Sequence, residues 1–365
     1  MKVLILANSD GGLYNFRREL METLLRKGHD VWVSVPMGYR VEYFKKMGCK
    51  MIDTAIDRRG ANPIKDLKLF RFYRKLIRQI RPDIVLTYTI KPNIYGGLAC
   101  RLFKIPYLCG ITGLGSAIEN GGILQHITLF LYLIALKKAQ KVFFENEENL
   151  NLFYQKKIVI NHNSLLPGSG VNLDVFPPLT YPQDNTIDFI FIGRIMKEKG
   201  IDEYLEAAQI IRNKYPNTRF HICGYSEEDY DAQLKKIQNS DVVIYHGKVK
   251  NIKEYLQKTH CTVLPSYHEG MSNALLESAA CARPLISTNI PGCREAIDDG
   301  VNGYLIHPKD SADLIAKIER FLSLTLEEKK QMGLAGRQKA ERQFSRQIVV
   351  DAYLEEIERI RIVKS

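Results

Sequence analysis

Four sequence patterns that identify common enzyme sites are missing from this chain of 365 residues. The dinucleotide fingerprint G-x-G-x-x-G is absent, because Gly110, Gly113 and Gly115 have the wrong spacing. No glycine loop ends in G-K-[ST], which excludes a P-loop. There is neither a G-x-S-x-G serine elbow nor an H-E-x-x-H zinc motif. The chain is therefore not a member of these common nucleotide-binding, hydrolase or zinc-protease classes.

Signals for disulfides, membrane spans and secretion are also scarce. The seven cysteines are scattered without a C-x-x-C pair, and an odd, unclustered set indicates reduced thiols in a cytosolic protein. The longest apolar run, Ile127 to Leu136, has only about ten residues before Lys137 and Lys138, too few to span a membrane. The apolar run at the N-terminus is too short for a signal peptide. We therefore expect a cytoplasmic protein.

The composition that remains is that of an ordinary globular protein, with 45% apolar and 25% charged residues. The length predicts two domains. The net charge of +11 is unevenly distributed. Residues 1–174 hold 26 Lys and Arg against 14 Asp and Glu, whereas residues 175–365 hold 26 against 27. The first half therefore carries the whole positive excess, which indicates an anionic partner there.

The densest positive segment, Lys65 to Arg81, holds seven basic residues and one acidic residue. Its apolar residues recur at helical spacing, which predicts an amphipathic helix. Such a helix suits the headgroup layer of an anionic membrane, and a helix packed on its own sheet with a solvated basic face is an equal alternative. We expect no nucleic-acid partner, because no recognised nucleic-acid motif accompanies the segment. The residues assigned to membrane contact are Lys68, Arg71, Arg74, Lys75 and Arg78.

The first half of the chain alternates strands and helices, which implies a parallel sheet. Met1–Ala7 and Asp30–Val35 are predicted strands on either side of a helix at Tyr14–Lys27, and the first strand is followed by a glycine-bearing loop, Asn8–Gly12. The remaining predicted elements are helices at 66–80, 94–103 and 123–138 and strands at 84–88, 107–110 and 141–145.

The second half repeats this alternation after a proline-rich segment, 161–185, that loses the periodicity and marks a domain boundary. Two doubly wound domains predict a cleft between them, with ligands at the carboxyl ends of the strands. The predicted elements of this half are strands at 188–192, 219–223, 242–245, 262–264 and 284–287 and helices at 201–214, 227–238 and 272–281.

One loop of the second half is suited to a phosphorylated ligand. Arg194 and Lys199 lie between Gly193 and Gly200, after a predicted strand and before a predicted helix. Two cations and a helix N-terminus in that place can hold a diphosphate. Two basic residues in a surface loop are usually without function, so this loop needs a second signal.

The second signal is a pair of carboxylates further along the chain. Glu269 lies in a glycine-containing loop after a predicted strand, and Glu277 lies two turns into the helix that follows. Both carboxylates could accept hydrogen bonds from hydroxyl groups of one ligand. Residues 270–272 would offer backbone N–H groups at the start of that helix.

These two stretches, G-R-x-x-x-x-K-G at 193–200 and P-S-x-x-E-G-x-x-x-x-x-x-E at 265–277, resemble glycosyltransferase family 4. Its members are retaining, nucleotide-sugar-dependent enzymes of GT-B fold. The resemblance covers essentially the whole chain and extends to Pro291-Gly292 with Glu295. It implies an α/β fold with two Rossmann-like, parallel-sheet domains at 1–170 and 187–345, joined by a linker at 171–186. A last helix at about 346–362 would cross back onto the first domain.

The resemblance also implies a donor site. Arg194 and Lys199 would bind the donor diphosphate and neutralise charge on the departing nucleotide. Glu269 would hold hydroxyls of the donor sugar, which completes the implied catalytic set. Front-face displacement needs no covalent nucleophile. The other donor-binding residues implied by the family are Gly11, Gly12, Gly193, Val249, Gly270, Met271, Ser272 and Glu277, with Glu277 on the ribose and Val249 near the base.

We expect no metal and no cofactor. Asp229-Tyr-Asp231 is formally a D-x-D pattern, but it stands in an acidic helix start and is typical of a charged cap. The donor nucleotide sugar, expected to be UDP-linked, is a substrate.

The chain departs from many family members where a histidine follows the strand at 107–110, since Ile111–Gly115 contains none. This segment and Thr87–Asn93 resemble the bacterial branch that builds capsular polysaccharide and lipid-linked oligosaccharides. The acceptor-binding residues assigned from this likeness are Lys91, Asn93 and Thr112. Lys91 could pair with an acceptor pyrophosphate, and a plain surface lysine is an equal alternative.

The expected function is transfer of a hexose or N-acetylhexosamine, with retention, to a polyprenyl-diphosphate-linked saccharide at the inner face of the cell membrane. The same chemistry on a soluble acceptor is the main alternative. A non-catalytic nucleotide-sugar-binding partner is disfavoured by the intact set of cations and carboxylates. A GT-B-fold UDP-sugar epimerase is disfavoured because it lacks the Glu269/Glu277 arrangement.

Overall fold

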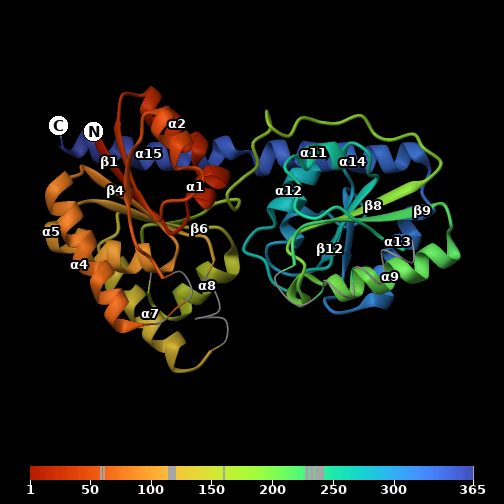
Figure 1. Cartoon of the computed structure of the whole chain (residues 1–365), viewed down its shortest axis with the longest axis horizontal. Helices are drawn as coiled ribbons and strands as arrows, with labels where there is room; N and C mark the ends of the chain where they lie inside the picture. Colours follow the sequence, from red (N-terminus) through yellow and green to blue (C-terminus); the bar gives the residue numbers. More distant parts are fainter. Residues whose placement is uncertain are drawn as a thin grey trace. The chain divides into compact units, whose positions relative to one another are not determined.

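The computed structural model of the chain describes residues 1–57, 60, 62–113, 121–158, 161–226, 230, 234 and 242–364. The chain forms two compact units, each with its own parallel sheet (Figure 1). Unit 1 consists of Met1–Ser169 and Gln347–Ser365, and unit 2 of Gly170–Arg346. The two-domain α/β architecture is confirmed. The predicted linker, 171–186, is included in unit 2.

Unit 1 contains seven strands in the order β3-β2-β1-β4-β5-β6-β7, and all neighbouring strands are parallel. The central strands are short apolar runs, as strands covered on both faces require, whereas the edge strands β3 and β7 are more polar. The strand order reverses beside β1, which is where doubly wound sheets bind ligands. The strands are β1 (Lys2–Leu6), β2 (Asp30–Val35), β3 (Lys50–Asp53), β4 (Ile84–Tyr88), β5 (Tyr107–Ile111), β6 (Lys141–Phe144) and β7 (Asn163–Leu165).

Helices cover both faces of this sheet. They are α1 (Asp10–Phe16), α2 (Arg18–Arg26), α3 (Val41–Met47), α4 (Pro63–Ile80), the π-helix η1 (Pro92–Gly96), α5 (Gly97–Phe103), α7 (Gly122–Leu136), α8 (Glu147–Gln155) and α15 (Arg346–Lys364). Leu4 and Leu6 of β1 share a core with α4, α5 and α7, whereas Val3 and Ile5 share the opposite core with α2 and α15. This alternation is the period of two that a strand imposes.

Helix α4 contains the basic segment that the sequence marks. Asn62 caps its N-terminus by accepting hydrogen bonds from two backbone N–H groups, and Pro63 occupies the first turn. Its apolar stripe is buried in unit 1 and consists of Leu69, Tyr73, Leu76, Ile77 and Ile80. The stripe is therefore part of the core, and the basic face meets solvent together with Ile64 and Leu67 near the N-terminus of the helix.

Unit 2 repeats the design with six parallel strands in the order β10-β9-β8-β11-β12-β13. The strands are β8 (Ile187–Ile192), β9 (Thr218–Cys223), β10 (Ile244–Tyr245), β11 (Cys261–Leu264), β12 (Leu285–Thr288) and β13 (Gly303–Ile306). The helices are η2 (Lys197–Lys199), α9 (Ile201–Lys214), α11 (Lys253–Leu256), α12 (Asn273–Ala280), η3 (Arg294–Ala296), α13 (Ser311–Leu322) and α14 (Leu326–Gln343).

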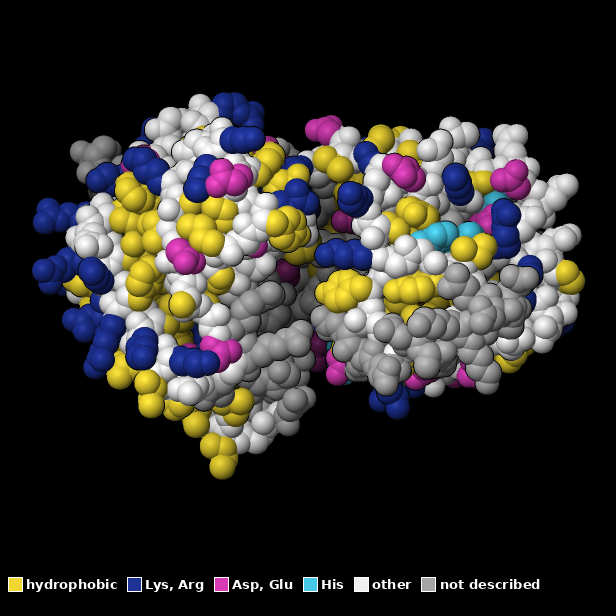
Figure 2. Space-filling view, viewed as in Figure 1, with side chains coloured by type: hydrophobic (Ala, Val, Ile, Leu, Met, Phe, Trp, Pro, Cys, Tyr) yellow, Lys and Arg dark blue, Asp and Glu magenta, His cyan; other side chains and the backbone are white. Residues whose placement is uncertain are grey.

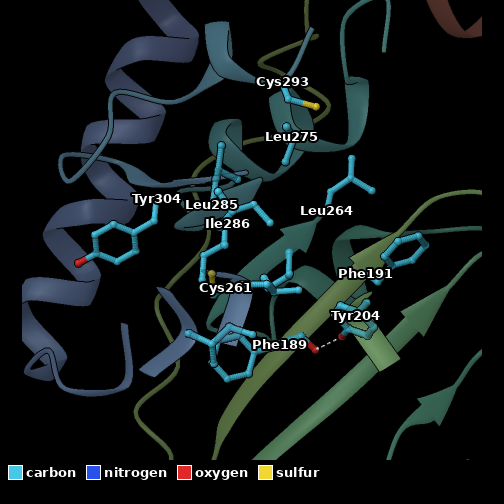
Figure 3. Packing of buried hydrophobic residues seen from close by; sticks show 14 of the residues in the cluster. Phe189, Phe191, Tyr204, Cys261, Leu264, Leu275, Leu285, Ile286, Cys293 and Tyr304 are labelled. Atoms are coloured by element: carbon cyan, nitrogen blue, oxygen red, sulfur yellow. Dashed lines mark hydrogen bonds between the residues drawn. The ribbon is translucent and has the colours of Figure 1, made fainter. Parts of the chain in front are cut away.

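The core of unit 2 joins α9 to the central strand. Phe189 of β8 packs against Phe220 of β9 with ring centroids 5.0 Å apart. The Tyr204 hydroxyl of α9 donates to the backbone oxygen of Phe189 at 3.4 Å (Figure 3). Leu264, at the carboxyl end of β11, belongs to the same cluster. The strand ends that carry the marked loops are thus held by a buried core.

The structure differs from the sequence-based elements at two places that matter for function. The expected loop Asn8–Gly12 is wrong, because α1 already begins at Asp10. Ser9 caps it by accepting a hydrogen bond from the Gly12 N–H at 3.1 Å. The segment 161–185, in which no element is predicted, contains β7, the edge strand of unit 1.

Candidate functional site

Three loops at the carboxyl edge of the unit 2 sheet are joined by backbone hydrogen bonds. The Tyr267 N–H, after β11, donates to the Glu198 carbonyl in the loop after β8, at 2.8 Å. The Ser272 N–H donates to the Gly292 carbonyl, after β12, also at 2.8 Å. Because parallel strands end at one edge, residues far apart in sequence meet here.

Two glycines allow these loops to approach so closely. Gly200 has a φ of +70°, and a Cβ there would lie 2.0 Å from the Pro265 carbonyl oxygen. A Cβ at Gly224, after β9, would lie 1.7 Å from the Gly193 carbonyl oxygen. Real Cβ atoms never approach so closely, so any larger residue would push the loops apart.

This packing brings Lys199 and Glu269 together. The Lys199 ammonium lies 2.6 Å from Glu269 Oε1, and each side chain is only 13% exposed. Arg194 lies in the same loop as Lys199 and is partly buried. A paired, largely desolvated carboxylate has a fixed orientation and keeps acceptor capacity on its second oxygen.

Glu277 is the second carboxylate of the site. It lies in the middle of α12, and no residue in the described part of the chain donates a hydrogen bond to its carboxylate. Burial raises its pKa to about 7, opposed by the charge of Arg346. A partly buried carboxylate without a donor can accept hydrogen bonds from hydroxyl groups of a ligand.

The N-terminus of α12 lies between the two carboxylates in sequence. Ser272 is its N-cap and is buried, but its side chain makes no capping bond. Met271 is also buried, whereas Gly270 is partly exposed. Val249, in the loop after β10, is partly buried against a small cluster that includes Ile190 of β8. These residues all follow strands at the same sheet edge.

In unit 1 the structure changes the conformation expected at Gly11 and Gly12. Both lie in the first turn of α1. The Gly11 N–H donates to the Asp10 carboxylate at 2.8 Å, and Asp10 also accepts from the Arg40 N–H at 2.8 Å. Both glycines thus lie at the start of a helix and not in a loop, and their approach to the donor phosphates stays a prediction.

The expected acceptor residues are not equivalent in the structure. Asn93 is fully buried, donates to the Gly110 carbonyl at 2.9 Å and accepts from the Thr87 hydroxyl at 2.6 Å. This residue ties η1 to β4 and β5, so it has no exposed group for an acceptor. The Lys91 ammonium pairs with Asp66 of α4 at 2.6 Å. Thr112 follows β5 and is partly exposed.

Sequence reasoning missed Thr89, which follows β4. It is a β-branched residue with a φ of +72°, a strained conformation that residues of this type rarely adopt. Its hydroxyl is buried and has no hydrogen-bond partner among the described residues. Nothing in a single sequence signals this strain, whereas the close approach at Gly224 could have been suspected from a glycine directly after a strand.

The five basic residues assigned to membrane contact are exposed on α4. Four of them line a surface pocket of about 340 Å³ together with Gln79 and Phe103. Within the described part of the chain, no carboxylate lies within 4 Å of any of the four. They are Arg71, Arg74, Lys75 and Arg78; Lys68 lies outside the pocket.

One group of three potential metal ligands occurs among the described residues, namely His307, Asp310 and Asp313. Local structure explains it, because Asp310 caps α13 and Asp313 accepts hydrogen bonds from the backbone and ring of the exposed His307. The D-x-D residues Asp229 and Asp231, and Gly115, lie outside the described residues.

Comparison with known proteins adds family evidence to this geometry. Residues 180–339 match the family model described as Glycosyl transferases group 1. Residues 2–146 match the model described as Glycosyl transferase 4-like. The two matches cover the main part of both units.

Two characterised relatives align along the chain. N,N'-diacetylbacillosaminyl-diphospho-undecaprenol alpha-1,3-N-acetylgalactosaminyltransferase of Campylobacter jejuni is 27% identical over 378 residues, with 99% of each chain covered. UDP-Gal:alpha-D-GlcNAc-diphosphoundecaprenol alpha-1,3-galactosyltransferase of Escherichia coli is 26% identical, with 72% of each chain covered.

Solved structures share the fold. Anabaena Alr3699/HepE, solved in complex with UDP and glucose, superposes with a TM-score of 0.79 at 15% identity and covers 98% of this chain and 99% of its own. At this identity the likeness concerns the fold alone, which is the two-domain GT-B arrangement.

Proposed function

The chain belongs to the group 1 glycosyl transferases and is thus a glycosyltransferase, and from this premise we propose that it moves a hexose or N-acetylhexosamine from a UDP-sugar to a polyprenyl-diphosphate-linked saccharide. The observation that carries the proposal is the Lys199–Glu269 pair beside Arg194 at the carboxyl edge of the unit 2 sheet. It combines cations for a diphosphate with a carboxylate for sugar hydroxyls.

In this proposal Arg194 and Lys199 bind the donor diphosphate and stabilise the negative charge that develops as the sugar leaves. Each such contact to a developing charge contributes about 3–4 kcal/mol in enzymes where it has been removed. The cations supply this stabilisation from the protein, so we expect transfer without a divalent metal and full activity in the presence of a chelator.

The two carboxylates have separate tasks. Glu269 accepts hydrogen bonds from the sugar hydroxyls on the oxygen that Lys199 leaves free, and Glu277 accepts them from the ribose. The N–H groups of residues 270–272, at the start of α12, add donors for phosphate and sugar oxygens. With no carboxylate assigned as a nucleophile, the departing phosphate takes the acceptor proton on the same face, which gives retention.

The acceptor class follows from charge and from relatives. Both relatives are named for saccharides on diphospho-undecaprenol. The positive excess of residues 1–174 suits a diphosphate on a lipid at an anionic membrane surface, and the exposed cations of α4 are its proposed contact. We therefore propose that the enzyme works at the inner face of the cell membrane.

The test is a transfer assay with a synthetic polyprenyl-diphosphate-linked saccharide and a panel of UDP-sugars. One UDP-sugar should give a product whose new linkage keeps the donor's anomeric configuration by NMR. Glu269→Ala should reduce the rate at least about 100-fold, whereas Glu206→Ala, an exposed carboxylate on α9, should not. A fully active Glu269→Ala enzyme would overturn the site.

A further inference from the structure

Helix α7 has no charged residue, yet one of its sides is exposed. Its 15 residues, GILQHITLFLYLIAL, include no Asp, Glu, Lys or Arg. Leu129 and Tyr132 pack into the core of unit 1. On the other side Ile123 is 82% exposed, Ile127 51% and Phe130 59%. His126 is exposed as well, but a helix without charged residues normally has both sides covered, so the exposed apolar residues indicate an apolar partner.

The cations of the α4 pocket have no carboxylate partner among the described residues. Some exposed lysines of unit 1 are neutralised, as Lys45 is by Glu42 at 2.7 Å and Lys50 by Asp30 at 2.8 Å. The four cations of the α4 pocket have no such carboxylate among the described residues. An unneutralised basic pocket of about 340 Å³ beside Phe103 is suited to a phosphate group with an apolar portion.

The apolar and basic surfaces lie on the same side of the unit 1 sheet. Both α4 and α7 contact α5 and η1, and all of them share one core. Leu102 of α5 is 58% exposed between them, and the adjacent Phe103 lines the pocket. Figure 2 shows Lys and Arg side chains along the edge of unit 1 where α4 and α5 lie and hydrophobic ones where α7 lies.

We infer that unit 1 docks on an anionic lipid bilayer with the exposed face of α7 in the interfacial region and the α4 pocket on lipid phosphates. The apolar stripe of α4 is buried in the core, and the exposed Ile64 and Leu67 lie near its N-terminus, so α4 supplies little of the inserted surface itself. Helix α7 can supply it, and with 15 residues it is too short to span a bilayer. None of the described helices is long and apolar enough to do so. The inference rests on the proposed lipid-linked acceptor.

The test is flotation of the full chain with vesicles of phosphatidylcholine containing 30 mol % phosphatidylglycerol, a composition we choose. Wild type should float, and much less with pure phosphatidylcholine. Ile123→Ser/Ile127→Ser/Phe130→Ser should lower the partition coefficient roughly tenfold or more. Replacing exposed apolar residues of unit 2, as Ile210→Ser/Val301→Ser/Leu326→Ser, is the matched control and should change it less than twofold.

The electrostatic part has its own pair of variants. Arg71→Glu/Arg74→Glu should weaken binding roughly fivefold or more per charge replaced. Lys27→Glu/Lys46→Glu makes the same change in net charge at α2 and α3, on the other face of the sheet, and should have less effect.

The same variants separate this inference from the proposed function. On a water-soluble, short-chain acceptor the α7 variant should keep the wild-type transfer rate, and it should lose activity only on acceptor embedded in vesicles. Wild-type flotation of the α7 variant would overturn the docking surface while transfer stands. The docking surface would also be overturned if the α7 variant lost a dimer or oligonucleotide binding and its vesicle binding stayed unchanged. Absence of transfer to the soluble acceptor by wild type would instead overturn the function.

Discussion

At position 277 a partly buried carboxylate has no hydrogen-bond donor among the described residues, and its pKa is raised to about 7. If ribose hydroxyls donate to the ionised form, the donor KM should rise as pH falls below 7, by up to about tenfold per pH unit. Glu277→Gln should raise KM at pH 8 and remove this pH dependence. A wild-type KM that is flat between pH 6 and 8 would contradict the role.

The same group makes a prediction for stability. Its pKa rises from 4.5 to about 7 on folding, so the folded state binds its proton more tightly than the unfolded state. The free energy of unfolding that this group contributes is therefore lost as pH rises from about 4.5 to about 7. Glu277→Gln should increase the free energy of unfolding by about 1–3 kcal/mol at pH 8 and have little effect at pH 4.5, measured by urea titration.

Lys199 should matter through its charge. Lys199→Met leaves Glu269 without its ammonium partner and removes a cation from the site, so kcat should fall about 100-fold or more. Lys197→Met, in the same short helix but exposed, should keep kcat within about threefold. Equal losses in both variants would show that the turn as a whole, and not the Lys199 ammonium, carries the effect.

Among the elements, the loop after β9 tests the close packing of the site. A methyl group at Gly224 would meet the Gly193 carbonyl at 1.7 Å, so Gly224→Ala should displace the Arg194 loop. We expect a loss of donor affinity and about 2–4 kcal/mol of unfolding free energy. Both variants are compared with wild type by thermal denaturation. Gly336→Ala in α14, where the nearest atom to the new methyl group is 3.6 Å away, should be neutral or slightly stabilising.

Arg283 anchors the start of unit 2. It is fully buried and donates only to backbone carbonyls, including Leu256 at 2.7 Å and Thr180 at 2.8 Å. Burial lowers its pKa to about 10. Arg283→Met would leave these carbonyls unsatisfied and should cost about 3 kcal/mol of unfolding free energy. An unchanged denaturation midpoint would show that segment 179–181 is held in another way.

Sequence patterns predict the central elements well and the peripheral ones poorly. The strand Asp30–Val35 and helix Ile201–Lys214 have the predicted bounds, because long apolar runs and helical periodicity leave one solution. Short edge elements such as β7 are not predicted, because three residues are too few to show a hydrophobic periodicity. The burial of Asn93 is not predicted for a different reason, since it depends on the π-helix, which a sequence pattern does not reveal.

For the whole molecule, the sequence predicts the family and the pairing of distant residues. Lys199 and Glu269 are 70 residues apart, yet the rule that parallel strands end at one edge predicts their proximity, and the structure gives 2.6 Å. What it does not predict is which surface of unit 1 is apolar. The run at 127–136 looks like a buried helix by composition, and only the packing shows that one side of it is exposed.

The central claim is that the carboxyl edge of the unit 2 sheet binds a nucleotide sugar. The most direct measurement is a thermal-shift titration of wild type and Arg194→Ala/Lys199→Ala with UDP-, GDP-, ADP- and dTDP-sugars. At 100 times its Kd a bound ligand adds about 2.7 kcal/mol, so one UDP-sugar should raise the Tm of wild type and not of the variant. Equal stabilisation of both proteins by the same sugar nucleotide would contradict the claim, because the donor would then bind elsewhere.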